Sequence, residues 1–209
     1  MDIELARAWV RAVAVAVEKN REHLSDLDAA IGDGDHGANL NRGFAAAAEA
    51  VEALQPETVG AVLVKAGTTL VSKVGGASGP LYGSALRAAG KRLTGASADP
   101  AEVAAALAAG LEEVRRLGGA QPGDKTMVDA YTPAVEAFTA AAERGAALAE
   151  AAQAAATAAE DGARATEPLQ ARKGRASYLG ERSKGHEDPG AASTALVFRA
   201  LADTAAAAG

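Results

Sequence analysis

The sequence predicts an all-α fold, and three observations support this prediction. Alanine dominates the apolar residues of the 209-residue chain, and alanine is the best helix former while it adds little core volume. β-branched residues occur singly or in short runs such as Ala61-Val62-Leu63-Val64, which fit a helix as well as a strand. Apolar residues recur at helical spacing from the first segment onward. We therefore expect closely packed helices around one core, in a single domain of residues 1–209.

The periodic segments predict eight helices. The first, from about Ile3 to Asn20, has its apolar residues at helical spacing, namely Leu5, Trp9, Val10, Val13 and Val17. Short polar or glycine breaks such as Gln55-Pro56-Glu57 separate later segments, as helix connections in a bundle do. The alanine-rich stretch from Ala146 to Ala165 has longer side chains at helical spacing, and we interpret it as a helix and not as a disordered segment. The other seven helices are predicted at Ala38–Leu54, Glu57–Val74, Gly79–Leu93, Pro100–Leu117, Thr126–Arg144, Ala146–Ala165 and Ala191–Ala207.

Charge and composition exclude several classes of function. The formal net charge is -6 and the sequence pI about 5.2, and Lys and Arg are scattered, so no nucleic-acid partner is expected. Cysteine is absent, which excludes disulfides, thiolate catalysis and Cys-ligated zinc and suits a reducing compartment. The first segment carries charges inside its apolar pattern, unlike a signal peptide, and no run approaches membrane-spanning length. We expect a soluble cytoplasmic protein with no membrane partner.

Four connections are too elaborate to be simple spacers. They combine glycines with Asp, His, Ser, Lys and Arg, whereas the other connections are short and plain. We expect these loops to converge at one end of a helical bundle and to form a site there. They span Ile31–Gly37, Gly75–Gly83, Gly118–Thr126 and Gly174–Gly190.

The first of these loops predicts a metal site. Asp28, Asp33 and Asp35 lie within eight residues, and glycines surround the last two. Carboxylates this close repel one another unless a cation joins them, and oxygen ligands without cysteine select Mg²⁺, Ca²⁺ or Mn²⁺. The alternative is a solvated turn in which an aspartate caps the following helix.

Two better-known loops do not fit. Gly32–Gly37 formally matches G-x-G-x-x-G, but no predicted strand precedes it and its acidic side chains would repel a bare pyrophosphate. A calcium EF-hand needs a third Asp or Asn where Gly37 stands and a Glu where Phe44 stands. Both interpretations are rejected.

Residues after the aspartates are suited to phosphate. A metal-held phosphate would meet His36 and the amides of Gly37, Ala38 and Asn39 at a helix N-terminus, which favours anions. A lone histidine is more often a core or surface residue, and that alternative stays open for His36.

The other loops offer weaker signals. Ser78 fits either a helix cap or a second anion-binding turn, with capping favoured. Met127 fits the core or a contact with a flat base, and its segment Gly123–Met127 lacks the P-loop pattern. Arg175 lies in a mixed-charge loop, where its planar fork suits phosphate oxygens as well as solvent.

Together these motifs resemble one family, the L subunit of dihydroxyacetone kinase, which also occurs as the C-terminal domain of single-chain dihydroxyacetone kinases. The resemblance spans nearly the whole chain, in family order. It implies an eight-helix antiparallel barrel with a nucleotide site at one end. The matching stretches are Ile31–Gly37, Gly75–Gly83, Gly123–Met127, Arg175–Arg182 and Asp188–Gly190.

The resemblance also assigns roles. Asp28, Asp33 and Asp35 would hold two Mg²⁺ ions that bridge the phosphates of ADP or ATP, and Arg175 would stabilise the transferred phosphoryl group. No catalytic nucleophile is expected on this chain, because in this family a histidine of a separate K subunit holds the sugar. The residues implied around the nucleotide are His36, Gly37, Ala38, Asn39, Ala77, Ser78, Gly118, Met127, Arg175, Asp188, Pro189 and Gly190.

The implied activity is phosphoryl transfer to dihydroxyacetone, with two modes of phosphate supply. Either bound ADP is rephosphorylated by the phosphohistidine-carrying M subunit of a phosphotransferase system, or ATP exchanges as a substrate. The chain begins close to its first helix and ends after its last, which indicates a free-standing subunit and favours the first mode.

Three other functions are weighed. An L subunit of an ATP-dependent kinase for another small ketose, such as erythrulose, would have a similar sequence. A nucleotide-loaded co-regulator that binds a transcription factor is a non-enzymatic alternative, and no residue separates it from the kinase role. A fatty-acid kinase domain ranks lower, because that family commonly has Thr where this chain has His36.

Overall fold

Residues 1–209 of the chain are described by a computed structural model that contains helices and no strand, apart from one isolated bridge between Asp2 and Ser97. The all-α prediction is confirmed. The elements are α1 (Ile3–Lys19), α2 (Arg21–Ile31), α3 (His36–Glu52), α4 (Val59–Lys73), α5 (Ser78–Arg92), α6 (Pro100–Gly118), α7 (Met127–Glu143), α8 (Leu148–Arg164), the 3-10 helix η1 (Arg175–Ser183) and α9 (Pro189–Ala207).

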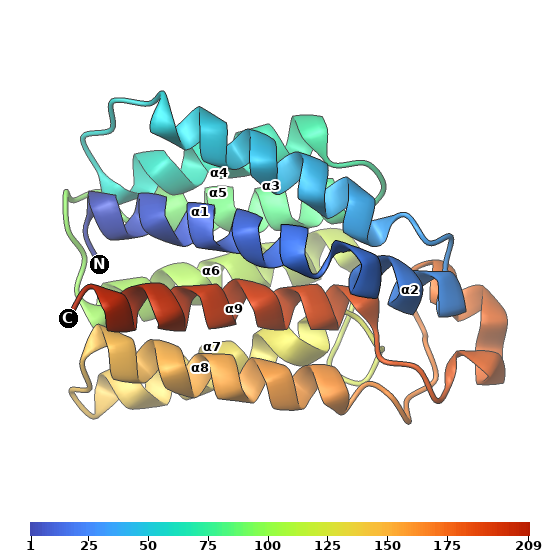
Figure 1. Ribbon diagram of the computed structural model, residues 1–209. Helices are drawn as coiled ribbons and strands as arrows, with labels where there is room; N and C mark the ends of the chain where they lie inside the picture. Colours follow the sequence, from blue (N-terminus) through green and yellow to red (C-terminus); the bar gives the residue numbers. More distant parts are fainter.

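Eight of the helices form a closed ring. In the order α1, α3, α4, α5, α6, α7, α8 and α9, each helix contacts the next, and α9 contacts α1 to close the circuit. Neighbours in the ring run in opposite directions, and both termini lie at one end of the molecule (Figure 1). α2 and η1 lie at the other end, beyond the ring (Figure 1). The arrangement matches the predicted eight-helix antiparallel barrel, with α2 as an addition to it.

Several helices begin where a capping residue stands. Thr58 accepts the amide of Ala61 at the start of α4, and Asp99 and Thr126 form capping boxes at the starts of α6 and α7. Each cap satisfies amides that have no partner inside the helix and contributes about 1 kcal/mol. These caps explain why the predicted helix starts near Glu57, Pro100 and Thr126 were nearly correct.

The alanine-rich stretch forms α8, which packs between α7 and α9. Its buried residues are all alanines, so the neighbouring backbones approach closely. At Gly162 a Cβ atom would overlap the carbonyl oxygen of Asp129 on α7. Small side chains therefore permit the close helix packing that the composition predicted. The buried alanines of this face are Ala151, Ala152, Ala155, Ala156, Ala159 and Ala163.

The sequence analysis was wrong about residues 21–31, which it left outside any helix. They form α2, whose buried positions are Leu24, Asp28 and Ile31. An aspartate thus occupies a position where the periodic pattern calls for an apolar residue, and this weakens the helical signal. The loop that follows is correspondingly shorter and runs only from Gly32 to Asp35.

Two other differences concern the elaborate loops. Arg175–Ser183, predicted as irregular, is the 3-10 helix η1, kinked at Gly180 with a positive φ of 58°. α3 begins at His36, two residues before the predicted Ala38, so His36 belongs to the helix.

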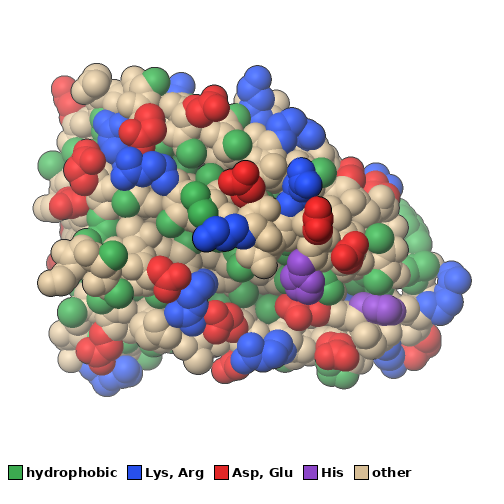
Figure 2. Space-filling view, in the orientation of Figure 1, with side chains coloured by type: hydrophobic (Ala, Val, Ile, Leu, Met, Phe, Trp, Pro, Cys, Tyr) green, Lys and Arg blue, Asp and Glu red, His purple; other side chains and the backbone are tan.

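The surface mixes charges of both signs. On the face shown in Figure 2, acidic and basic side chains alternate and form no large field of one sign. No helix of the chain combines the length and the apolar character that crossing a bilayer requires.

Candidate functional site

A cavity of about 280 Å³ lies at the end of the barrel where α2 and η1 are found. All four elaborate loops contribute to its lining, so they converge as the sequence analysis predicted. Most of the predicted site residues line it. These are Asp28, Asp33, Asp35, His36, Ala77, Ser78, Gly118, Met127, Arg175, Asp188, Pro189 and Gly190.

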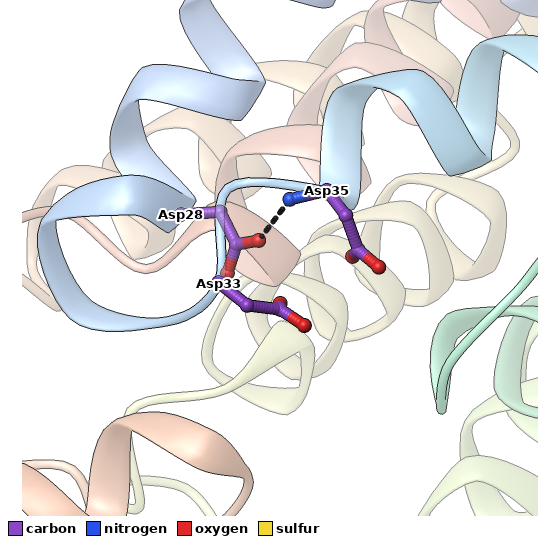
Figure 3. A group of neighbouring side chains, drawn as sticks. All are labelled: Asp28, Asp33 and Asp35. Carbon is purple, nitrogen blue, oxygen red and sulfur yellow. Dashed lines mark hydrogen bonds between the residues drawn. The ribbon is translucent and has the colours of Figure 1, made fainter.

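Three carboxylates gather at one side of this cavity. Asp28 belongs to α2, Asp33 lies in the connection, and Asp35 immediately precedes α3. One carboxylate oxygen from each lies within 4.8 Å of the others, and Figure 3 shows Asp33 and Asp35 projecting to the same side beside Asp28. Asp28 is nearly buried, whereas Asp33 and Asp35 are exposed. The cluster is an all-oxygen group of the kind that holds a hard divalent cation.

Asp28 also organises the start of α3. Its Oδ2 accepts the amides of Asp35 (2.9 Å) and His36 (3.2 Å), as Figure 3 shows for the first. One feature of the alternative is therefore present, since an aspartate of the cluster caps the following helix: Asp28 supplies the acceptor from α2, whereas Asp35 stands at the N-cap without a side-chain bond. The second oxygen, Oδ1, fills the space where a side chain at Gly32 would begin.

Arg175 pairs with the cluster. Its Nη1 lies 3.0 Å from Oδ2 of Asp33, and the two side chains are 69% and 36% exposed. An ion pair this exposed contributes at most about 1 kcal/mol because water screens it and two flexible side chains are ordered. The pair can therefore exchange for a phosphate or a metal at little cost.

His36 lies beside the aspartates but points inward. Its Nδ1 lies 3.2 Å from Ser78 Oγ and its Nε2 lies 2.9 Å from Ser193 Oγ. Burial lowers the pKa of His36, while the charges of Asp28 and Asp35 oppose this. His36 is thus a buried residue that also lines the cavity. The capping interpretation of Ser78 is wrong, because α5 has no side-chain cap and the Ser78 hydroxyl contacts His36 instead.

Three predicted residues do not line the cavity. Gly37 is buried against the backbone of α2, where a Cβ atom would overlap the carbonyl oxygen of Arg21. Ala38 is exposed, and the Asn39 side chain accepts from Arg42 at 2.6 Å. The amides of Gly37 and Ala38 lie in the first turn of α3, where helix amides lack partners within the helix.

The far part of the cavity is apolar. Leu81, Val114, Gly118, Ala120 and Met127 line it, and the Nζ atom of Lys173 lies close to Gly119 at its edge. Met127 is 5% exposed, so it belongs to the core and to the cavity wall at once. This end suits a flat apolar group such as a purine base.

Asp188 caps α9 at the cavity wall. Its carboxylate accepts the amide of Ala191 at 2.7 Å, and Pro189 follows in the first turn, where a missing amide proton costs nothing. Burial raises the pKa of Asp188 to about 7, although the Ala191 amide and the charge of Lys125 favour the ionised form. This carboxyl therefore changes its charge near neutral pH.

The sequence analysis missed Lys125, which is only 1% exposed and has a positive φ of 62°. Its ammonium donates to the carbonyls of Thr166 (2.7 Å) and Glu167 (3.4 Å) and to that of His186. One buried cation thus ties together both ends of the segment that carries Arg175. Burial lowers the pKa of Lys125, while Asp188 and Glu167 oppose this. No local pattern signals such a role, because its acceptors are backbone atoms far along the chain.

Comparison with known proteins decides the family. The DAK2 domain family matches residues 30–203, which is most of the chain. The chain belongs to the family of dihydroxyacetone kinase L subunits. It is 41% identical over 203 residues to "PEP-dependent dihydroxyacetone kinase 1, ADP-binding subunit DhaL" of Listeria innocua, with 97% of both chains covered. The predicted family is confirmed.

Two longer proteins contain a similar part. The D-erythrulose kinase of Mycolicibacterium smegmatis is 42% identical over 203 residues, which cover 95% of this chain and 35% of that protein. The crystal structure of the dihydroxyacetone kinase of C. freundii in complex with AMP-PNP and Mg²⁺ matches with a TM-score of 0.75 at 30% identity, covering 97% of this chain and 34% of that one. The L-subunit fold thus occurs alone and within larger kinases.

Replacing Lys125 tests its role in this L subunit. We expect Lys125→Met to lower the free energy of unfolding by about 2 to 4 kcal/mol, because the carbonyls of Thr166 and His186 lose a buried charged donor. Urea unfolding measures the loss, and amide hydrogen exchange should accelerate between residues 166 and 187. Lys173→Met, at an exposed lysine of the same cavity, is the control and should change little. Equal stability of both variants would contradict the stabilising role of the Lys125 hydrogen bonds.

The raised pKa of Asp188 predicts a pH dependence of stability. The folded chain holds this proton more tightly than the unfolded chain, whose carboxyl has a pKa near 3.8. The contribution of protonated Asp188 to the free energy of unfolding is therefore fully present below pH 3.8 and is lost as the pH rises through about 7.

The neutral variant Asp188→Asn keeps a capping side chain and does not titrate. The stability of the unmodified protein relative to this variant should fall by at most about 4 kcal/mol between pH 4 and pH 8, measured by urea unfolding at each pH. A difference that stays constant across this range, or grows, would show that Asp188 is ionised throughout.

Proposed function

We propose that this chain is the adenine-nucleotide-binding subunit of a cytoplasmic dihydroxyacetone kinase. It would transfer a phosphoryl group from Mg²⁺-bound nucleotide to dihydroxyacetone held on a separate K subunit, and a phosphohistidine-carrying M subunit would rephosphorylate the ADP. The observation that carries this proposal is the cluster of Asp28, Asp33 and Asp35 beside the start of α3, in a cavity with an apolar far end.

The three aspartates fit magnesium ions. Oδ2 of Asp28 is occupied by two amides, which leaves Oδ1 for a metal, and Asp35 forms no ion pair with any Lys or Arg. Carboxylate oxygens are the ligands that Mg²⁺ prefers, and we propose that two such ions are held here with phosphate oxygens completing their coordination. Bound Mg²⁺ supplies charge neutralisation at the phosphoryl oxygens during transfer.

The remaining residues position the nucleotide. His36, Ala77 and Ser78 face the phosphates together with the first-turn amides of Gly37 and Ala38, while Asn39, whose amide donates to the Asp35 carbonyl, follows them in the same turn. Arg175 would give up its pair with Asp33 where that carboxylate holds a metal, and its guanidinium, whose planar fork matches phosphate oxygens, would face the phosphates.

The base lies in the apolar end of the cavity. Gly118 leaves this wall open, since a Cβ atom there would meet only Leu81 at 3.6 Å, and Met127 forms the opposite contact. Asp188, Pro189 and Gly190, at the start of α9, border the nucleotide on the side of the polar cluster.

The chain itself supplies no nucleophile for the sugar. Its contribution is to hold the nucleotide in line with an acceptor brought by the K subunit and to neutralise the charge of the moving group. The likeness to a D-erythrulose kinase supports a second candidate, an L subunit of a kinase for another small ketose that exchanges ATP.

Replacement of Asp33 tests the metal site. We expect Asp33→Ala to lower the Mg²⁺-dependent affinity for ADP by at least about 100-fold, since it removes one charged metal ligand and adds no structural defect. Isothermal titration with and without Mg²⁺ measures this, and the melting temperature should stay within a few degrees.

The matched control is Asp26→Ala, an exposed aspartate of α2 outside the cluster, which should bind ADP normally. Unchanged ADP affinity in Asp33→Ala would disprove the assignment. Asp28 is unsuitable for this test because it also caps α3.

Retention of the nucleotide separates the two modes of phosphate supply. If ADP serves as a cofactor, protein purified without added nucleotide should release close to one equivalent of ADP on denaturation and should resist exchange with labelled ATP. An empty site that binds ATP reversibly would instead favour an ATP-dependent ketose kinase. Chromatography of the denatured extract is the measurement.

A further inference from the structure

A chain of buried hydroxyl groups lies behind the phosphate side of the cavity. Tyr82 Oη lies 2.7 Å from Ser193 Oγ, which lies 2.9 Å from His36 Nε2, and His36 Nδ1 lies 3.2 Å from Ser78 Oγ. Tyr82 and Ser193 are buried, and Ser193 does not line the cavity. Ser78, His36 and Tyr82 line the cavity, and Ser78 stands at the end of the series. The chain therefore connects the barrel interior to one potential phosphate ligand.

The hydrogen bonds of this series of hydroxyl groups can run in two directions. A neutral imidazole has one N–H and one acceptor nitrogen, so a donor at Nδ1 requires an acceptor at Nε2, and the reverse. If Nδ1 donates to Ser78, the Ser78 hydroxyl proton is free to point into the cavity. If Nε2 donates to Ser193, Ser78 must give its proton to Nδ1 and shows only lone pairs to the cavity.

The surrounding bonds favour the first direction. Burial raises the pKa of Tyr82 to about 12, so the phenol keeps its proton and has one to donate. Thr194 donates to the Gly190 carbonyl at 2.8 Å, which takes one of the two lone pairs of that oxygen. Ser193 then has its shorter contact to His36 Nε2 at 2.9 Å and a longer one to Gly190 at 3.1 Å. These contacts allow each hydroxyl to donate once along the path Tyr82, Ser193, His36 and Ser78, and the backbone of Pro189 is a further hydrogen-bond partner of the His36 ring.

We propose that Tyr82 and Ser193 are positioning residues that hold His36 in the Nδ1–H form, and so present Ser78 as a hydrogen-bond donor to a nucleotide phosphate. Phosphate oxygens only accept hydrogen bonds, so the opposite direction would set Ser78 lone pairs against them. This proposal rests on the proposed function, because it takes the anion at Ser78 to be the phosphate of ADP. Ser193 does not line the cavity, and Tyr82 acts through its hydroxyl contact with Ser193.

The ¹⁵N chemical shifts of the His36 ring measure the tautomer directly. The chain has three histidines, and His23 and His186 are exposed, so a His23→Gln/His186→Gln background leaves one ring signal pair. At a pH where His36 is neutral, we expect a protonated Nδ1 and an unprotonated Nε2, with and without Mg²⁺-ADP.

Ser193→Ala removes the donor to Nε2. We expect the ring signals to move toward a mixture of both forms and the affinity for Mg²⁺-ADP to fall about fivefold to tenfold, as one hydrogen bond to a charged group is weakened. Tyr82→Phe keeps the ring contact with Phe44 and should produce a smaller change in the same direction. It provides a second test if Ser193→Ala is poorly folded.

Thr194→Val is the matched control. Thr194 is equally buried and bonds Tyr82 and Gly190, but it does not contact His36. Its replacement should leave the His36 signals unchanged and alter ADP affinity less than about twofold. Equal effects of Thr194→Val and Ser193→Ala would show a general packing defect and overturn the proposal.

Two further outcomes judge the proposal separately from the proposed function. An Nε2–H form of His36 in the unmodified protein, or an unchanged ring signal in Ser193→Ala, would overturn the proposed direction of the hydrogen bonds, whether or not nucleotide binds. Failure of the unmodified protein to bind Mg²⁺-ADP would instead overturn the proposed function, since the tautomer is read in the nucleotide-free protein as well.

Discussion

The Asp28 carboxylate is the contact on which the cavity depends most. It stands on α2, outside the eight-helix ring, and one of its oxygens holds the first amides of α3. That bond fixes where α3 begins, and with it the positions of Asp35 and His36. Its other oxygen stays with the carboxylate cluster. Because a single side chain does both, the geometry of the proposed metal site and the geometry of the phosphate side cannot change independently.

The opposite wall depends on a different buried charge. Lys125 gathers carbonyls from both ends of the segment that carries η1, and the same segment leads into Asp188 at the start of α9. A buried ammonium with several carbonyl partners is stable only while all of them stay in place. The loop before α7 and the loop before α9 are therefore joined through this side chain. Arg175, by contrast, is exposed and paired weakly, which leaves it free to respond to a ligand.

The fold and the site are linked by side-chain size. Small residues let the barrel helices pack closely, and the two longest irregular segments are left to one end, where they enclose the cavity. Large side chains in the core are few, and one of them, Tyr82, extends from the interior to the polar cluster. The hydroxyl chain from Tyr82 to Ser78 is thus part of the core and part of the site, and packing fixes its geometry.

The sequence by itself determined the helical class, most helix positions, the family and the aspartate cluster. These follow from local signals: alanine content, apolar spacing, capping residues and motifs contiguous in the chain. α2 could not be found in this way, because one of its buried residues is the polar Asp28. This aspartate is buried because its carboxylate accepts backbone amides at the start of the next helix. The sequence also favoured a cap for Ser78, where the structure places a bond to His36. Lys125 and Ser193 gave no signal, since their partners lie 41 to 61 and 157 residues away. Only the tertiary structure decided these contacts, because closure of the helical ring brings such distant residues together.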